Sequence, residues 1–191
     1  MRINRPFFYD TAKSPEIGLF TYFGKKQTEG IEALFAEWEK RNLADMRWLA
    51  YILATVYHET GRTMQPIEEF GKGKKQKYGK PDPVTGMVYF GRGHTQNTWA
   101  ENYKKLTIAA EGEGHTWDFY KNPSLLLQMA PSVWATYHGM LNGLYTGKKL
   151  SDYFNGDTYD WLNARRIING IDRAEDIARY AKNFLKCLSS I

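Results

Sequence analysis

Hydrophobic residues recur at helical spacing in several stretches of the chain, and these stretches predict its main elements. From 28 to 41 the apolar positions lie three or four residues apart, with charged residues between them. Between 45 and 60 the same pattern is stronger, and apolar residues also occupy the opposite side. A helix that is apolar nearly all round belongs in the interior, so we expect this one at the centre of the protein. Asp45 can cap its start and Gly61 can end it.

The rest of the chain predicts further helices joined by loops. Helical patterns are found at 98–106, 131–144, 158–168 and 173–188. Residues 69–86 are rich in Gly, Lys and Pro and predict an exposed basic loop, and Val88–Phe90 is expected to form a short strand. There is no internal repeat and no tract that resembles a linker. The pattern therefore predicts a single domain over residues 1–191, mainly α, with at most a small β element.

Charge and aromatic content add two pieces of information. Lys and Arg outnumber Asp and Glu by 26 to 21, which gives a formal net charge of +5 and favours a polyanionic partner. Nucleic acid, anionic lipid and the bacterial cell wall all qualify, although a basic surface without a partner explains the charge alone more simply. Aromatic residues make up 15% of the chain, which suits a sugar-stacking groove as well as a core.

The sequence shows neither a disulfide framework nor a membrane segment. Cys187 is the single cysteine, so neither a disulfide nor a cysteine-based metal cluster is expected. The N-terminus lacks a continuous apolar stretch, and no segment reaches transmembrane length. We expect synthesis in the cytoplasm without a signal peptide.

The central helix ends in a candidate general acid, Glu59, which follows His58. Glu59 shares a helical face with apolar residues, and both burial and the C-terminal end of the helix dipole disfavour its negative charge. Glycosidic cleavage needs a carboxyl that keeps its proton near neutral pH. Taken alone, a Glu at a helix end is more often a solvated surface residue. The zinc-binding pattern His-Glu-x-x-His is not completed, because Arg62 stands at its last position, and we expect no metal.

A second carboxylate is available at Glu68 or Glu69, nine and ten residues after Glu59. An inverting glycosidase needs its acid and base carboxyls about 6.5–9.5 Å apart, to leave room for the attacking water. A turn and a short return of the chain can provide that separation. Nearby lysines are also expected to pair with at least one of the two, which leaves the choice of base open.

A segment rich in Gly and neutral polar residues follows at 89–103. Glycines on both sides of Arg92 permit a tight backbone, while Gln96, Thr98 and Asn102 offer hydrogen-bonding groups for a water or an acetamido group. A phosphate-binding loop is the rival interpretation. The segment 89–103 lacks the lysine and the full glycine fingerprint that such loops require.

Taken together, these segments resemble glycoside hydrolase family 19, the chitinase-like family that includes phage and prophage endolysins. The matching segments are 54–61, 89–103 and 167–170, and the resemblance covers roughly 28–188. It implies a bilobal, lysozyme-like helical fold, hydrolysis in a single displacement with inversion, and no cofactor. Two positions depart from the family pattern: Arg62 replaces the usual glycine and Asn97 an apolar residue.

The resemblance also implies roles for single residues. Glu59 corresponds to the general acid, Glu68 or Glu69 to the general base, and Thr98 to the residue that holds the nucleophilic water. The substrate-binding residues that it implies are Gln96, Asn102, Tyr89, Arg92 and Asn169.

The leading functional hypothesis is a peptidoglycan glycosidase, an endolysin-type lysozyme that cuts β-1,4 bonds between amino sugars. Such an enzyme is expected to act as a monomer and to reach the cell wall after release, through a holin-type pore. A chitinase acting on N-acetylglucosamine polymers is the alternative within the same class. A noncatalytic wall-binding module and a nucleic-acid binder are alternatives from other classes. The nucleic-acid alternative rests only on charge and on the loop from Lys72 to Lys80, so we expect no specific nucleic-acid partner.

Overall fold

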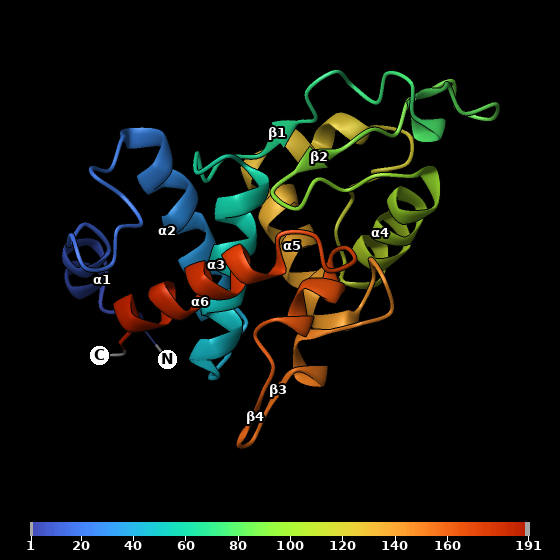
Figure 1. Cartoon of the computed structure of the whole chain (residues 1–191). Coiled ribbons are helices and arrows are strands. Elements are labelled where there is room, and N and C mark those ends of the chain that lie inside the picture. Colours follow the sequence, from blue (N-terminus) through green and yellow to red (C-terminus); the bar gives the residue numbers. More distant parts are fainter. Residues whose placement is uncertain (1, 190–191) are drawn as a thin grey trace.

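The computed structural model describes residues 2–189, and in this range the chain is mainly helical, as predicted (Figure 1). Its α-helices are α1 (Arg5–Ala12), α2 (Lys25–Lys40), α3 (Met46–Glu59), α4 (Ala100–Gly112), α5 (Met129–Asn142) and α6 (Ala174–Cys187). Two antiparallel pairs of strands join β1 (Ile67–Glu68) to β2 (Arg92–Gly93) and β3 (Phe154–Asn155) to β4 (Thr158–Tyr159). Short 3₁₀ helices are η1 (Lys77–Gly79), η2 (Pro123–Leu127), η3 (Leu150–Asp152) and η4 (Asn163–Ile167).

The helix α3 lies at the centre of the fold, which confirms the sequence-based prediction. Every residue from 49 to 57 is buried, and α3 packs most extensively against α6. The Asp45 carboxylate accepts a hydrogen bond from the backbone N–H of Arg47 (3.0 Å) and caps the helix start. Gly61, at φ +56°, follows the last turn. Although α3 is apolar, no helix in residues 2–189 is both long and apolar enough to cross a membrane.

Buried apolar residues form two clusters. The larger one contains residues of α1, α2, α3 and α6. The smaller one packs α4 against α5 and the segments around Tyr89 and Phe119. Helix α5 contributes to both, because Val133 and Tyr137 belong to the larger cluster and Trp134 to the smaller. The two clusters therefore define two lobes that share one helix.

The segment after α3 is held against α2, and this fixes the end of α3. At Gly30 in α2 an added Cβ would lie 1.8 Å from the carbonyl oxygen of Met64, so only glycine permits this approach. The amide of Gln27 donates to the carbonyl of Arg62 (3.0 Å), and the amide of Gln65 donates to the carbonyl of Lys26. The chain leaving Glu59 is thus anchored along the first turns of α2, at Lys26, Gln27 and Gly30.

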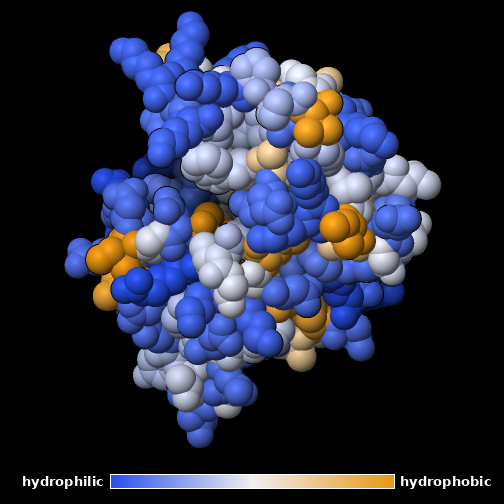
Figure 2. Space-filling view, turned by 90° about the vertical axis from the view of Figure 1, so that its right-hand side faces the viewer, coloured by the Kyte–Doolittle hydropathy of each residue, from blue (hydrophilic) through white to orange (hydrophobic). Residues whose placement is uncertain are grey.

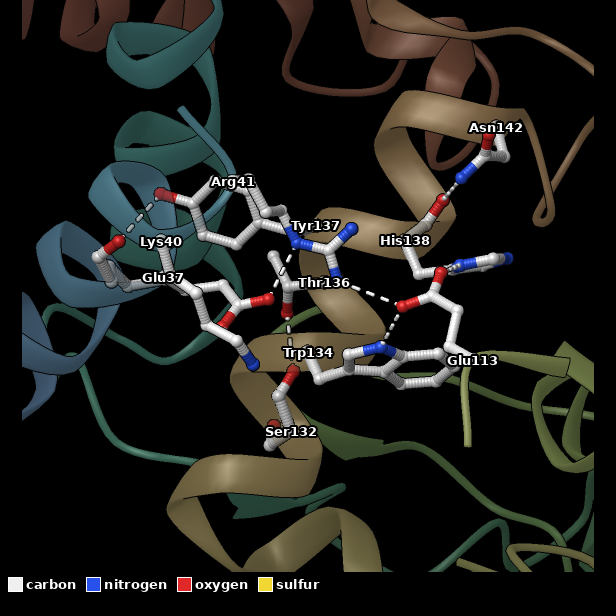
Figure 3. A network of polar contacts seen from close by, with 11 residues as sticks. Glu37, Lys40, Arg41, Glu113, Ser132, Trp134, Thr136, Tyr137, His138 and Asn142 are labelled. Atoms are coloured by element: carbon white, nitrogen blue, oxygen red, sulfur yellow. Dashed lines mark hydrogen bonds and ion pairs between the residues drawn. The ribbon is translucent and has the colours of Figure 1, made fainter. Parts of the chain in front are cut away.

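A polar network around Glu113, drawn in Figure 3, connects three helices at the junction of the lobes. The Glu113 carboxylate, just after α4, accepts hydrogen bonds from Trp134 Nε1 and His138 Nδ1 of α5, both at 2.7 Å. Arg41, at the end of α2, lies 3.6 Å from the same carboxylate. Burial alone would raise the pKa of Glu113, but the hydrogen bonds from Trp134 and His138 lower it below its usual value.

Three expectations about secondary structure were wrong or incomplete. Val88–Phe90 does not form a strand, since the carbonyl of Tyr89 accepts from Trp99 N–H and the rings of Tyr89 and Phe90 are buried. The helix expected at 158–168 is a hairpin followed by η4, and the Asp160 carboxylate accepts a hydrogen bond from the backbone N–H of Asn163, the first residue of η4. Helix α1 was not predicted, although the Asn4 side chain caps it.

Candidate active site

A polar cleft of about 490 Å³ lies between the two lobes. One side is formed by the end of α3 and by residues 168–169, and the other by residues 69, 78, 91, 95–99 and 102. The lining residues are Glu59, Glu69, Tyr78, Gly91, Thr95, Gln96, Asn97, Thr98, Trp99, Asn102, Tyr145, Ile168 and Asn169. Five of the residues predicted from the sequence, together with one of the two candidates for the base, therefore meet in one cavity.

Glu59 reaches the cleft from the last residue of α3, with its side chain 15% exposed. Its Oε1 accepts a hydrogen bond from Nη1 of Arg165 at 2.6 Å. The Arg165 side chain is only 4% exposed, and its Nε donates to the backbone carbonyl of Asp172 (3.1 Å). Burial lowers the pKa of the adjacent His58, so this imidazole is neutral at pH 7. The charge that faces Glu59 is therefore the guanidinium of Arg165.

Glu69 approaches from the opposite lobe, directly after β1. Its Oε1 accepts a hydrogen bond from the Tyr78 hydroxyl, and its Oε2 accepts from the backbone N–H of Gly91, both at 2.9 Å. Burial and this hydrogen bond raise the pKa of Tyr78, which keeps the phenol protonated as a donor. Two neutral donors thus hold the Glu69 carboxylate in one orientation at the cleft wall.

Glu68 does not line the cleft. Its carboxylate lies 2.9 Å from Lys72 Nζ and 3.8 Å from Arg92 Nε. The expectation that nearby lysines pair with at least one of the two glutamates is confirmed for Glu68. The pairing of β1 continues at Glu69, whose N–H donates to the carbonyl of Gly91 (2.7 Å). Neighbouring residues of such an extended chain point to opposite faces, which explains the difference between Glu68 and Glu69.

Gly91 allows Glu69 and Gln96 to approach each other. A Cβ at Gly91 would lie 3.0 Å from Gln96 Oε1 and 3.2 Å from Glu69 Cβ, closer than ordinary contact. The amide nitrogen of Gln96 donates to the carbonyls of Ile67 and Gly93, both at 3.0 Å. With its nitrogen occupied, Gln96 presents its carbonyl oxygen beside Glu69.

Thr98 and Asn102 line the cleft next to Gln96, on the loop before α4 and its first turn. The Asn102 amide donates to the carbonyl of Thr98 (3.0 Å), which couples the two positions. Trp99, at φ +72° and 48% exposed, packs edge-on against Tyr78, with ring centroids 5.2 Å apart. Together with Tyr145, these two rings are the aromatic part of the cleft wall.

Asn169 lines the cleft from the lobe of Glu59, whereas Tyr89 and Arg92 lie outside it. The Tyr89 ring is 2% exposed, and its hydroxyl donates to the carbonyl of Tyr120 (2.6 Å). The Arg92 guanidinium donates to the carbonyl of Val88 (2.9 Å) and lies 3.5 Å from the Phe90 ring centroid. In this structure both side chains make contacts within the smaller lobe and none with the cavity.

Arg165, Tyr78 and Asn97 are among the residues of the site that the sequence analysis missed. Arg165 is one of two adjacent arginines, and nothing in the pattern distinguishes it from the exposed Arg166. Tyr78 lies in a segment whose composition predicts only a loop. Asn97 was noted as a departure from an apolar position; it is 3% exposed, and no described residue gives its side-chain amide a hydrogen-bond partner.

The cleft combines a carboxyl beside a guanidinium, a carboxylate held by two neutral donors, and several amide and hydroxyl groups. Between residues 2 and 189 no group of three or more His, Cys, Asp or Glu side chains could hold a metal ion. The arrangement can therefore donate a proton from one wall and accept one at the other, with neutral polar groups between them.

Comparisons with known proteins gave matches only among solved structures. Neither a family model nor a curated protein matches the chain. Chitinase C from Streptomyces griseus HUT6037 is similar at 23% identity and a TM-score of 0.47, over 74% of this chain and 58% of that one. A bacterial family 19 chitinase is similar at 20% identity and a TM-score of 0.43, over 92% and 93% of the two chains. At these identities and scores, the similarities decide nothing about activity.

Proposed function

We propose that this protein is a glycoside hydrolase that cleaves β-1,4 bonds between amino sugars, with inversion, and that its substrate is peptidoglycan. The observation that supports it best is the pair Glu59 and Glu69, which line one polar cleft from opposite lobes. Hydrolysis with inversion needs a proton donor on one face of the sugar and a base that activates water on the other. The neutral groups between the two carboxyls suit the hydroxyl and acetamido groups of an amino sugar.

In this proposal Glu59 is the general acid. A protonated carboxyl still has a carbonyl oxygen that accepts hydrogen bonds, and Oε1 accepts one from Arg165 (2.6 Å). The proton is then on Oε2, from which it passes to the glycosidic oxygen as the bond to the anomeric carbon breaks. Arg165 orients Glu59 and does not itself transfer a proton.

Glu69 is the general base, in preference to Glu68. It accepts hydrogen bonds at both oxygens from neutral donors and carries no ion pair within residues 2–189. It takes one proton from a water molecule, whose oxygen attacks the anomeric carbon from the face opposite the leaving group. Gln96 and Thr98 border the same position and hold that water, while Asn102 and Asn169 contact the sugars. No role in binding is retained for Tyr89 or Arg92.

Three matched substitutions test the assignment: Glu59→Gln, Glu69→Gln and Glu68→Gln. The first two should abolish hydrolysis of purified sacculi, and the third should leave it within a few-fold of the unmodified protein. Circular dichroism and thermal unfolding check that all three variants fold. Substantial activity in Glu59→Gln contradicts the catalytic proposal and favours a noncatalytic wall-binding module. If only Glu68→Gln loses activity, Glu68 and not Glu69 would be assigned as the general base.

The substrate and the stereochemistry need a product analysis. Mass spectrometry of digested sacculi should show intact disaccharide-peptides with a hydrated reducing end, and proton NMR taken early should show the α-anomer. An anhydro sugar or a freed peptide among the products would indicate a reaction other than hydrolysis of the glycosidic bond. Faster release of oligosaccharides from chitin than of muropeptides from sacculi would instead identify a chitinase. We further propose an endolysin-type role in which the enzyme reaches the wall through a separate membrane pore. Lysis that needs co-expression of such a pore tests it.

A further inference from the structure

A lysine-rich loop leaves the cleft at Glu69 and returns to it at Tyr78. The Tyr78 hydroxyl bonds the Glu69 carboxylate (2.9 Å), so the segment 70–77 is closed at the cleft rim. It is also closed internally: a Cβ at Gly79 would lie 1.9 Å from the carbonyl oxygen of Gly73. This rim loop therefore remains beside the cleft, and its side chains project from one short, tightly closed turn of chain.

The rim loop is rich in positively charged side chains. Lys72, Lys74, Lys75 and Lys77 lie in it, and Lys80 follows directly. All five side chains are exposed. Lys72 is paired with Glu68 (2.9 Å), whereas among residues 2–189 no carboxylate lies within ion-pair distance of Lys74, Lys75 or Lys77. Three unneutralised ammonium groups thus lie within four positions of the chain.

An exposed aromatic residue begins the same loop. The Phe70 side chain is fully exposed, with a relative accessibility of 103%, although it directly follows Glu69. In Figure 1 the chain between β1 and β2 runs along the top of the molecule and extends to the right. The face on that side is mostly hydrophilic, with hydrophobic residues in small separate groups (Figure 2). An isolated ring beside cations suits a sugar face next to acidic substituents rather than an apolar partner.

We propose that the rim loop is a second substrate-binding surface, in which Lys74, Lys75 and Lys77 bind carboxylates of a glycan strand that carries acidic peptides, while Phe70 packs against a sugar. This inference rests on the proposed function and specifies its substrate. A strand that occupies the cleft continues past Glu69 and Tyr78, and there its acidic peptides meet the lysines. A neutral amino-sugar polymer offers these lysines nothing to bind.

The test compares two triple variants with equal charge. Lys74→Gln, Lys75→Gln and Lys77→Gln together lower the formal net charge from +5 to +2, because three positive charges are removed. Lys26→Gln, Lys182→Gln and Lys186→Gln remove the same charge from exposed lysines that do not line the cleft. The rim variant should raise KM for sacculi about tenfold and leave kcat unchanged, with a weaker dependence on salt. The control variant should change KM less than twofold.

Two further substrates make the outcome specific. On uncharged N-acetylglucosamine oligosaccharides, the rim variant and the unmodified protein should have the same KM. Their KM values should also be equal on sacculi whose carboxyls have been amidated. Phe70→Ala should weaken binding of intact and of amidated sacculi. Equal losses on charged and neutral substrates, or equal losses in both triple variants, would overturn the proposal.

A binding assay separates this inference from the proposed function. Sedimentation of the protein with intact and amidated sacculi reports on the rim loop even if no hydrolysis is found. Preferential binding to intact sacculi that the rim variant loses supports the loop, whatever the catalytic result. Tighter binding to duplex DNA than to sacculi at the same salt concentration would assign the lysines to polyphosphates instead.

Discussion

Arg165 donates a hydrogen bond of 2.6 Å to Glu59, and the two residues lie 106 positions apart in the chain. The guanidinium is almost completely buried and is itself fixed by the backbone carbonyl of Asp172. Because the pair joins η4 to the end of α3, it sets the direction in which the Glu59 carboxyl enters the cleft.

The first prediction concerns this pair. Arg165→Met should lower kcat by roughly 10²-fold, because Glu59 loses the donor that orients it, and should cost about 1–3 kcal/mol of unfolding free energy. Steady-state kinetics and urea unfolding measure the two effects. The neighbouring Arg166→Met, whose side chain is exposed, is the matched control and should change little. Unchanged kcat in Arg165→Met would remove the residue from the mechanism.

The second prediction concerns Thr98. Thr98→Ala should lower kcat by roughly 10²-fold, as expected for the loss of one positioned hydrogen bond to the nucleophilic water. Thr98→Ser keeps the hydroxyl and should recover most of the rate. Thr95→Ala removes a hydroxyl that bonds Tyr145 (3.0 Å) and serves as the comparison. Equal rates in Thr98→Ala and Thr98→Ser would exclude the hydroxyl as the acting group.

The third prediction follows from the close packing at Gly91. Gly91→Ala places a methyl group 3.0 Å from Gln96 Oε1 and 3.2 Å from Glu69 Cβ, so both side chains must shift. We expect at least a tenfold loss of kcat and about 1–3 kcal/mol of destabilisation. Gly112→Ala, where an added Cβ meets nothing within 4 Å, is the control. Full activity in Gly91→Ala would show that Glu69 does not need its present position.

The fourth prediction concerns pH and stability. Burial lowers the pKa of His94 to about 4, and its side chain is 0% exposed. The unfolded chain binds a proton near pH 6.5 and the folded protein only near pH 4. Stability present above pH 6.5 is therefore lost as the pH falls toward 4, by about 3 kcal/mol over that range.

Urea unfolding at several pH values between 7.5 and 4.5 measures this loss. His94→Gln should be less stable at neutral pH, since it loses the bond to Ser132 (2.8 Å), and its stability should depend less on pH. The same slope in both proteins would contradict the assignment to His94.

The central helix could be predicted from the sequence because its signals are local. Its caps, Asp45 and Gly61, adjoin the apolar pattern that they limit. The strand expected at Val88–Phe90 failed because tertiary contacts override the local preference of aromatic residues for strands. The helix expected at 158–168 failed for a related reason, since Gly156 at φ +53° turns the chain into a hairpin just before it.

The candidate site was predicted in part. Glu59, Gln96, Thr98, Asn102 and Asn169 belong to the three segments that carry the resemblance to glycoside hydrolase family 19. The choice between Glu68 and Glu69 depends on which side of β1 faces the cavity, and two adjacent glutamates carry no information about that. Arg165 depends on a contact across most of the chain. Tyr78 depends on how a glycine-rich loop closes.

Glu59 ends α3, a helix of the larger hydrophobic cluster. Glu69 follows β1, which pairs with β2, and β2 packs against η2 of the smaller cluster, while α5 contributes to both clusters. The separation between Glu59 and Glu69 thus depends on how the two clusters pack against each other along α5. Substitutions along α5, none of whose residues lines the cleft, should increase or decrease that separation while both lobes keep their own folds. If the proposed function is correct, tolerance for bulky substituents on the glycan is then adjustable from behind the cleft, without changing a single residue that lines it.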